Sequence, residues 1–287
     1  MNPKRADFRC LHRLRVRWAE VDMQKIVFNA HYLMYFDTAM ADYWRELAVP
    51  YEAAMHLLNG DLYVKKASVE YFSSARYDDQ LEIGLRCGRI GNSSIIFDGA
   101  IFRGDTLLVT GELIYVFADP ATQTSRPVPD ALRDLLMAYE SGQSMVRVET
   151  GNWATLESQA SPLRQAVFVQ EQGIDAALVW DAADADAVHA ILINRLGMAV
   201  ASGRLVQQAP GVGRMGRMAV DRVLRGSSLG RAMLDALVSS ARSRGDKEVM
   251  LHAQRSAEGF YRRLGFVARG APFEEAGLDH IEMVLAL

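Results

Sequence analysis

The alternation of hydrophobic and polar positions makes the first half of the chain rich in predicted strands. Apolar residues alternate with arginines over 13–18, which predicts a half-buried strand. From Asn29 to Pro50 apolar residues recur every three or four positions, which predicts one long helix. Four further strands are predicted between polar turns, at 66–72, 81–87, 94–102 and 107–117. Because the turns are short, we expect an antiparallel meander wrapped around the helix.

The pattern changes in the second half of the chain. A short predicted helix over 130–139 leads to a polar linker that we place near 141–148. Helix and strand signals then alternate, which is typical of an α/β layered domain. The predicted helices are 162–171, 229–244 and 256–264, and the predicted strands are 188–193, 198–206, 215–220, 248–254 and 280–285. We therefore expect a two-domain α+β and α/β protein, with domains at 1–142 and 149–287.

Composition excludes several classes of protein. Half of the 287 residues are hydrophobic, and the net charge of −3 gives no reason to expect a nucleic-acid or membrane-surface partner. Cys10 and Cys87 are far apart and outside any CxxC spacing, which favours a reducing compartment and no metal site. Residues 1–13 lack an apolar signal region, and no stretch approaches the roughly 20 apolar residues of a membrane span. We expect a cytoplasmic protein.

The segment from Trp18 to Tyr32 carries the first candidate chemistry. Together with 35–37 and 74–79, it resembles the 4-hydroxybenzoyl-CoA thioesterase family of hotdog proteins over residues 12–138. The resemblance implies a hotdog fold, acyl-CoA hydrolysis, and Asp22 as the general base for water or the nucleophile. A carboxylate beside a helix N-terminus also faces amides that polarise a carbonyl. The alternative is that Asp22 only caps the loop.

Two positions near Asp22 depart from the family pattern. Lys25 stands where the family has glycine, and Asn29 stands where one branch often has histidine. The lysine either pairs with Asp22, which weakens hydrolysis, or binds a CoA phosphate. Lys65, Lys66 and Arg76 are further candidates for phosphate contacts, although lysines that flank a strand usually form a solvated edge, and Arg76 is the preferred one.

Residues 216–232 resemble motif A of the GNAT superfamily, with Arg225, Ser228 and Gly230 at the motif positions and serine replacing the middle glycine. In such a loop, backbone amides at a helix N-terminus bind a pyrophosphate, and small residues let it approach. The implied CoA contacts run from the strand into the helix: Met218, Val220, Arg225, Gly226, Ser227, Ser228, Leu229, Gly230 and Arg231.

A second GNAT hallmark lies at 256–266, where Phe-Tyr is followed by Leu-Gly-Phe. The resemblance implies that Tyr261 protonates the departing CoA thiolate, the alternative being a structural tyrosine. Three segments, 163–172, 251–254 and 277–281, are similar to the ElaA-like branch, and the resemblance extends over 153–287.

The acceptor amine must lose a proton, so the domain needs a base. The candidates are His252, Glu274, Glu275 and His280, although a strand histidine and a loop acid pair are ordinary features. Arg164 and Glu171 either line the acceptor pocket or form a helix-surface pair.

The sequence therefore predicts a bifunctional enzyme that uses acyl-CoA and acetyl-CoA without a metal, with Asp22 and Tyr261 as its catalytic residues. A homodimer or tetramer through the hotdog domain is expected, because the sheet leaves an open edge. In the alternative, a degenerate hotdog domain only oligomerises or senses acyl-CoA. A third possibility is an acceptor that is a protein N-terminus or lysine.

Overall fold

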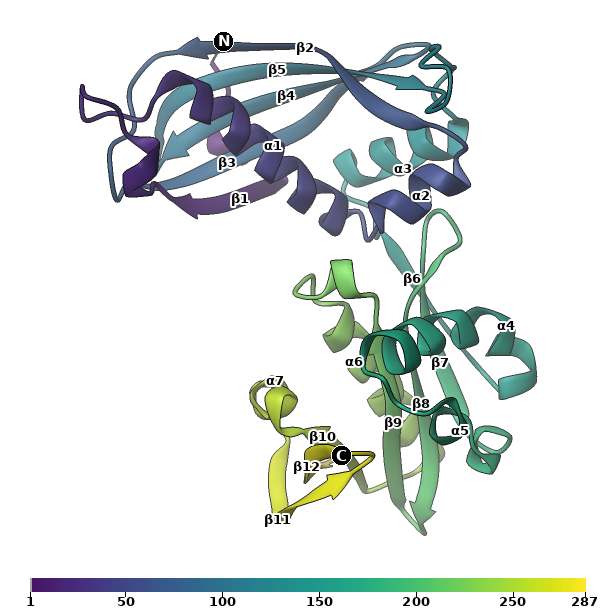
Figure 1. Ribbon diagram of the computed structural model, residues 1–287. Helices are drawn as coiled ribbons and strands as arrows, with labels where there is room; N and C mark the ends of the chain where they lie inside the picture. The colour runs from purple at the N-terminus through teal and green to yellow at the C-terminus, as the bar shows by residue number, and fades with distance from the viewer. Residues whose placement is uncertain (1) are drawn as a thin grey trace. The chain divides into compact units, whose positions relative to one another are not determined.

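The computed structural model describes residues 2–287, which form two compact units (Figure 1). The first unit extends to Met145 and the second runs from Val146 to Leu287. Among the described residues, none of the helices combines the length and apolar character needed to cross a bilayer.

The N-terminal unit is one antiparallel sheet with a long helix against it. Its elements are β1 (Cys10–Arg15), α1 (Asn29–Glu46), α2 (Tyr51–Leu57), β2 (Asp61–Tyr71), β3 (Gln80–Ile90), β4 (Ser94–Arg103), β5 (Thr106–Ala118) and α3 (Asp130–Glu140). The strand order is β1-β3-β4-β5-β2. Strands β1 and β2 therefore form the two edges of the sheet.

A pair of glycines positions helix α1 on the sheet. Gly99 of β4 and Gly111 of β5 are direct partners across the two strands. A Cβ atom on either glycine would lie within 2.6 Å of the ring of Phe36, which is fully buried. The two missing side chains leave a notch that this ring fills, so the helix is fixed across β4 and β5.

Three elements of this unit differ most from the prediction. Strand β1 begins and ends earlier than the predicted 13–18, and Trp18 opens a 3-10 turn, Trp18–Glu20. The helix predicted from Asn29 to Pro50 ends earlier, at Glu46, because the chain turns at Ala48, whose φ is +54°, and the separate helix α2 after Pro50 was not predicted. Strand β2 starts at Asp61, ahead of the predicted 66, because its exposed first residues carry little periodic signal.

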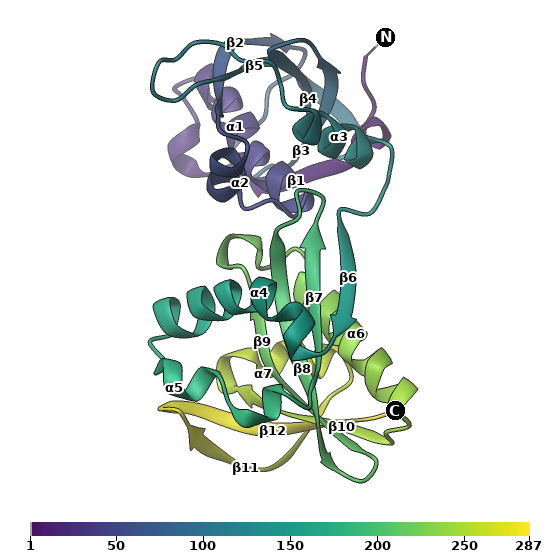
Figure 2. The same cartoon turned by 90° about the vertical axis from the view of Figure 1, so that its right-hand side faces the viewer.

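The C-terminal unit is a seven-stranded mixed sheet with helices on both faces (Figure 2). Its strands are β6 (Val146–Gly151), β7 (Val188–Asn194), β8 (Ala199–Ala209), β9 (Val212–Val220), β10 (Glu248–Gln254), β11 (Val267–Glu275) and β12 (Leu278–Ala286). Its helices are α4 (Trp153–Arg164), the π-helical turn η3 (Gln165–Glu171), α5 (Ala176–Val179), α6 (Leu229–Arg244) and α7 (Glu258–Arg263). The strand order is β11-β12-β10-β9-β8-β7-β6.

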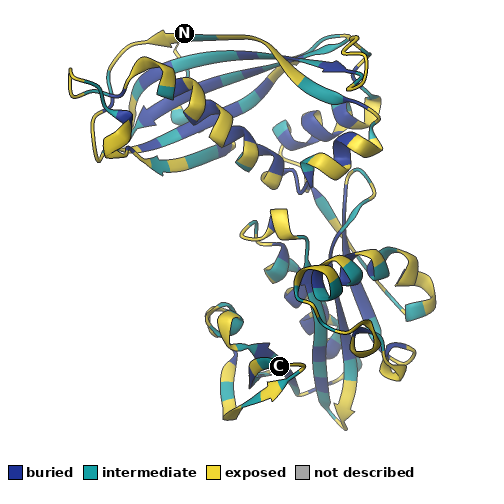
Figure 3. Ribbon diagram, in the orientation of Figure 1, coloured by how far each residue is buried: buried dark blue, intermediate teal, exposed yellow. Residues whose placement is uncertain are grey.

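Helices α4 and α6 cover opposite faces of this sheet. Leu156 of α4 packs against Ile191 and Ile193 of β7. On the other face, a Cβ on Gly203 of β8 would meet Leu237 of α6. Gly203 pairs with Ala190 of β7, and Ala190 faces the opposite side of the sheet from its neighbour Ile191. The central strands are therefore buried on both faces, as Figure 3 shows.

Three elements of this unit differ most from the prediction. Strand β6 begins inside the predicted linker, at Val146, and pairs with β7. The predicted helix 162–171 is the end of α4 followed by η3, so helical structure starts nine residues earlier, at Trp153. Strand β11 was not predicted. Most of its residues are exposed, and it contains Gly270 and Pro272, so it carries neither periodicity nor strand propensity.

Buried charges join helix α4 to the sheet. Asp184 is 3% exposed, and its carboxylate contacts the guanidinium groups of Arg164 at 2.9 Å and Arg204 at 2.8 Å. Arg164 also stacks on the Trp153 ring at 4.5 Å and donates to Nδ1 of His189 at 3.2 Å. His189 in turn donates from Nε2 to the Asp184 carbonyl, and burial lowers its pKa, so the ring is neutral. Asp184 is therefore a buried carboxylate that Arg164 and Arg204 share.

We predict that Asp184→Asn lowers the unfolding free energy of this unit by about 3–5 kcal/mol, because it leaves buried guanidinium charge uncompensated. Chemical denaturation of the full chain, with hydrogen exchange over residues 153–220, measures the loss. Asp186→Asn is the matched control, since Asp186 is exposed two residues away. Equal effects of the two variants would contradict the role given to Asp184.

Candidate functional site

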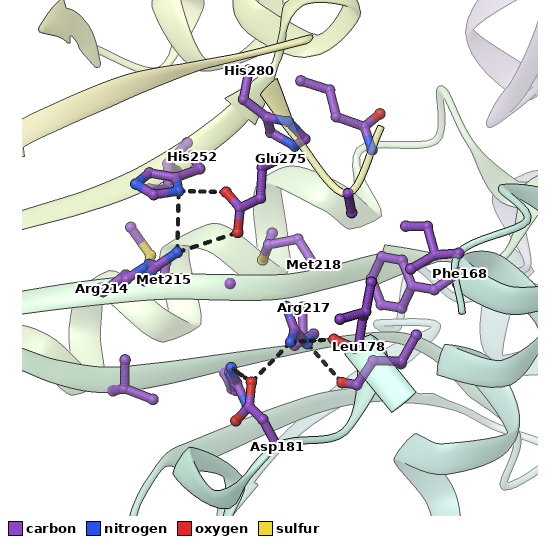
Figure 4. Close-up of a pocket in the computed structure, with 18 of the residues that line it drawn as sticks. Phe168, Leu178, Asp181, Arg214, Met215, Arg217, Met218, His252, Glu275 and His280 are labelled. Carbon is purple, nitrogen blue, oxygen red and sulfur yellow. Dashed lines mark hydrogen bonds and ion pairs between the residues drawn. The ribbon is translucent and has the colours of Figure 1, made fainter. Parts of the chain in front are cut away.

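The first candidate site opens where two parallel strands part. Strands β9 and β10 are paired only over Val212–Met215 and Glu248–Leu251, and the register between them ends there. A cavity of about 760 Å³ lies beyond this point (Figure 4). Both strands contribute to its wall, through Gly216, Arg217 and Met218 of β9 and His252 and Gln254 of β10.

A β-bulge shapes the β9 side of this cavity. The register between β8 and β9 shifts at Gly203, which lies opposite two residues, Arg217 and Met218. Arg217 has a left-handed backbone with φ of +51°, an uncommon conformation for a residue with a side chain. Because a bulge leaves the extra residue out of the ladder, backbone polar groups of this segment are available to a ligand.

His252 forms a short contact with Glu275 in the cavity wall. Its Nδ1 lies 2.5 Å from Oε2 of Glu275 and 3.1 Å from Nη2 of Arg214. Nδ1 cannot donate to Glu275 and accept from Arg214 at the same time. Because an ionised carboxylate can only accept a hydrogen bond, the proton is assigned to Nδ1. Burial alone raises the pKa of Glu275, but His252 and Arg214 outweigh it and hold that pKa below its usual range. In the neutral ring the lone pair is therefore on Nε2.

The two other base candidates are placed differently. His280 lines the same cavity, but its Nδ1 donates to the Leu278 carbonyl at 2.8 Å rather than to a carboxylate. Glu274 is exposed and is not part of the cavity wall. Strand β11, where a loop was expected, turns neighbouring residues to opposite faces, so Glu275 faces the cavity and Glu274 does not.

Tyr261 reaches the cavity from helix α7. It is 9% exposed, and its ring packs edge-on against Phe260 and Phe266 with centroid separations of 5.0 and 5.8 Å. Burial raises the pKa of Tyr261 to about 12. Its hydroxyl is therefore protonated at neutral pH, as a proton donor must be.

The expected pyrophosphate loop lies between β9 and α6. Gly226 and Ser228 both have left-handed backbones, with φ of +87° and +67°. The first N–H groups of α6 have no acceptor within the helix, so they point outward as donors. The predicted contacts from Arg225 to Arg231 lie along this loop and helix start, whereas Met218 and Val220 belong to β9.

Two predicted residues are engaged in other contacts. Arg225 donates from Nη1 and Nη2 to both carboxylate oxygens of Glu171, at 2.6 and 2.7 Å. This bidentate pair, which ties η3 to the loop, holds the pKa of Glu171 below its usual range. The hypotheses for Arg164 were an acceptor-pocket position or a surface pair with Glu171. The structure gives neither, because Arg164 is buried against Asp184 and is absent from the cavity wall.

Asp22 lies in a tight turn before helix α1. Val21 and Val27 form an isolated bridge, and the Asp22 N–H donates to the Ile26 carbonyl at 2.9 Å. Oδ1 of Asp22 accepts from the Gln24 N–H at 2.8 Å, which leaves Oδ2 without a partner among residues 2–287. Lys25 has a left-handed backbone with φ of +63°, and its ammonium group forms no ion pair within the described chain.

Arg76 lies in a segment next to the Asp22 turn. The Ala75 carbonyl accepts from the Val27 N–H at 2.9 Å, which joins the two segments. Arg76 is exposed, and its guanidinium has no partner among the described residues. Beside it, the exposed Tyr77 ring packs edge-on against Trp18 at 5.4 Å. The structure therefore brings the segments of Asp22 and Arg76 together.

The sequence did not identify several residues at these sites. Arg214 and Arg217 line the cavity, and on sequence alone they are two of many arginines. Glu20, which is 3% exposed, accepts from Tyr35 at 2.9 Å and pairs with Arg17 next to the Asp22 turn. No signal in the sequence distinguishes this buried glutamate. No group of three His, Cys, Asp or Glu side chains suited to a metal occurs within residues 2–287.

Two parts of the chain match known proteins. Residues 166–287 match the acetyltransferase (GNAT) domain, and residues 24–110 match the thioesterase superfamily. A Bacillus subtilis protein named a putative acetyltransferase is 32% identical over 127 residues, 43% of this chain and 85% of that protein. The acyl-CoA thioester hydrolase YbgC of Escherichia coli is 28% identical over 120 residues, 42% of this chain and 89% of that protein. The crystal structure of a putative N-acetyltransferase from Lactobacillus plantarum covers 50% of this chain and 99% of its own, at 30% identity and a TM-score of 0.48.

These matches coincide with the two units. The antiparallel sheet with its long helix has the hotdog architecture of thioesterases, and the mixed sheet with helices on both faces has that of GNAT proteins. The chain belongs to the GNAT acetyltransferase family through its C-terminal unit, and its N-terminal unit carries a domain of the thioesterase superfamily.

Proposed function

We propose that the protein is a bifunctional enzyme that hydrolyses acyl-CoA in its N-terminal unit and transfers an acetyl group from acetyl-CoA to an amine in its C-terminal unit. The observation that carries the proposal is the cavity between β9 and β10, whose wall holds Tyr261 and the His252–Glu275 pair. An acid and a base that share one cavity are what acyl transfer to an amine requires.

His252 and Tyr261 divide the two proton transfers. The acceptor enters as an ammonium ion and gives a proton to Nε2 of His252, while Glu275 holds the opposite nitrogen. The freed amine attacks the thioester carbonyl and forms the C–N bond. When the tetrahedral intermediate collapses, the C–S bond breaks and the sulfur takes the hydroxyl proton of Tyr261. The attacking nitrogen loses its second proton to water as the amide forms. His252 then releases its proton to solvent and the tyrosinate takes one up, so both groups return to their starting states and one proton is released overall.

The loop at the start of α6 supplies the CoA site in this proposal. The free N–H groups of Leu229 and Gly230 bind the pyrophosphate, supported by the helix dipole. Ser228 takes the left-handed conformation that the motif glycine adopts easily, so the loop keeps its shape. Arg225 reaches a phosphate by sharing its guanidinium with Glu171 or by displacing that carboxylate.

Asp22 carries out hydrolysis in the N-terminal unit, either as general base for water or as nucleophile on the thioester carbonyl. Its Oδ2 oxygen is free for either role, while Oδ1 is held by the turn. The similarity to YbgC, a protein named an acyl-CoA thioester hydrolase, supports the substrate class. Arg76, on the adjoining segment, binds a CoA phosphate.

A second reading gives the N-terminal unit no chemistry: it assembles the protein or senses acyl-CoA, and only the C-terminal unit catalyses. The observation that favours it is the open edge strand β2, which is exposed over much of its length and is suited to pairing with a second copy. A homodimer or tetramer through this unit is part of both readings.

We predict that Asp22→Asn abolishes amine-independent acyl-CoA hydrolysis and leaves acetyl transfer unchanged, because it removes the basic carboxylate and nearly preserves its shape. Thiol release from an acyl-CoA panel, measured with and without amines, checks this. Asp105→Asn, in an exposed loop of the same unit, is the control. Hydrolysis at the parental rate in Asp22→Asn would remove Asp22 from catalysis.

The reciprocal variant is Gly230→Glu, which places a carboxylate where the pyrophosphate binds. A Cβ at Gly230 lies no closer than 3.4 Å to its neighbours, so the first atom of the new side chain meets no clash, and circular dichroism of the variant checks its fold. Activity assays should show that acetyl transfer is lost while hydrolysis survives. Calorimetry should show that one of the two CoA sites per chain is lost. Binding of only one CoA by the parent, with none left in the variant, favours the second reading.

We predict that Tyr261→Phe lowers kcat for acetyl transfer by about 100- to 10,000-fold, the contribution of a positioned proton donor. Affinity for acetyl-CoA should change little, because only a hydroxyl is removed from a packed ring. Steady-state kinetics and acetyl-CoA titration separate the two. An unchanged kcat assigns Tyr261 to packing.

His252→Gln should lower kcat at neutral pH by a similar factor, and the deficit should shrink as pH rises toward the pKa of the acceptor amine. The reason is that an amine already deprotonated in solution needs no base. His280→Gln is the matched control, a histidine of the same cavity without a carboxylate partner. A deficit independent of pH, or one equal in both variants, contradicts the base assignment.

A further inference from the structure

The wall of the cavity carries more guanidinium groups than carboxylates. Three arginines line it, Arg204, Arg214 and Arg217, against two acids, Asp181 and Glu275, which leaves one positive charge in excess. The buried pair behind this wall, Arg164 and Asp184, adds one charge of each sign, so the excess remains. Protonation of either cavity histidine would only increase it.

The excess is concentrated on Arg217. Arg204 is fully engaged, since it binds both oxygens of Asp181 at 2.7 and 2.6 Å and also contacts Asp184 at 2.8 Å. Asp181 is therefore already neutralised when Arg217 Nη2 reaches it at 2.9 Å. Burial and the repulsion of Arg204 lower the pKa of Arg217, as expected for a cation without a carboxylate of its own.

Backbone carbonyls hold Arg217 in place and leave part of it free. Its Nε donates to the Val179 carbonyl and its Nη2 to the Leu178 carbonyl, both at 2.7 Å. The N–H groups of Nη1 have no partner within the part of the chain that the structure describes. Figure 4 shows Arg217 on the wall across from His252 and Glu275.

An acceptor amine meets a difficulty in such a cavity. It arrives as a cation beside a wall with excess positive charge, and desolvation strengthens the repulsion. An acceptor that brings its own anion removes the difficulty, because the anion pairs with the free guanidinium edge while the amine faces His252. Phe168, Leu178 and Met218 supply an apolar surface for the rest of the molecule.

We propose that the acetyl acceptor is a small amine that carries its own acidic group, a carboxylate or a phosphate, and that Arg217 is the residue that binds this group. The inference rests on the acetyl transfer proposed above. It disfavours protein lysines and polyamines, whose flanking groups are neutral or cationic.

Matched acceptors test the proposal on the full chain. The first set is phenylalanine, which carries a carboxylate, with its primary amide and phenethylamine, which do not. The second set is phosphoethanolamine, which carries a phosphate, with ethanolamine, which does not. We expect kcat/KM with acetyl-CoA to be at least about tenfold higher for one acidic member than for its neutral counterparts. Which pair shows the difference identifies the anion.

Arg217→Gln should bring the kcat/KM for the acidic acceptor close to the kcat/KM for its amide. Arg217→Lys should restore part of the preference for the acidic acceptor. Arg242→Gln, on the exposed face of α6, removes a charge outside the cavity and should keep the parental preference. The preference of the parental protein for acidic acceptors is measured without any variant. Misfolding of Arg217→Gln therefore does not leave the proposal untested.

The outcomes separate this inference from the function on which it rests. Acetylation of neutral amines or a lysine peptide as well as of the acids overturns the anion site and leaves the transferase intact. Acetylation of no amine contradicts the transferase, and calorimetry in the presence of CoA then decides the anion site separately. Binding of N-acetylphenylalanine but not of its amide supports the site, and equal binding of both overturns it.

Discussion

The separation of two parallel strands is the constraint on which the C-terminal site depends. Strand β10 pairs with β12 from Glu248 to Gln254, while β9 pairs with β8 up to Val220. Each strand is therefore held by its outer neighbour after the two have ceased to pair with each other. The gap stays open for this reason, and side chains from both halves of the sheet face one cavity. That is why His252 and Arg217 are on opposing walls.

In the turn after Asp22 and in the loop before α6, a residue with a side chain has the left-handed backbone that glycine adopts easily. Lys25 and Ser228 occupy positions where the resembled families have glycine, and both have left-handed φ values, +63° and +67°. Such a conformation costs about 1–2 kcal/mol for a residue with a Cβ, so the surrounding turn must enforce it. Any silencing of hydrolysis by Lys25 would then come from its side chain rather than from collapse of the turn. That side chain forms no ion pair with Asp22 among the described residues.

Sequence predicted the strongly periodic elements and the motif residues, but not the partners that give those residues their chemistry. Helix α6 and strand β10 have the predicted bounds, Leu229–Arg244 and Glu248–Gln254, because their apolar spacing is regular and their ends are marked. Strand β11 is polar and mostly exposed, so neither the strand nor its register could be predicted. The register decides that Glu275, not Glu274, meets His252. Burial of an arginine at Arg164 likewise depends on tertiary charge pairing, which no local pattern encodes.

One ion pair links the proposed CoA loop to the cavity between β9 and β10. Glu171 binds Arg225 of the loop, and the same π-helical turn supplies Phe168 to the cavity wall. Gln172, which follows Glu171, accepts a hydrogen bond of 3.3 Å from the side chain of Gln254, the last residue of β10. A phosphate that reaches Arg225 has to share its N–H groups with Glu171 or displace it, since the bidentate pair already uses both Nη atoms. In the proposed function, occupancy of the loop by a phosphate would therefore act on a segment that also borders the cavity, so η3 joins the two proposed substrate sites.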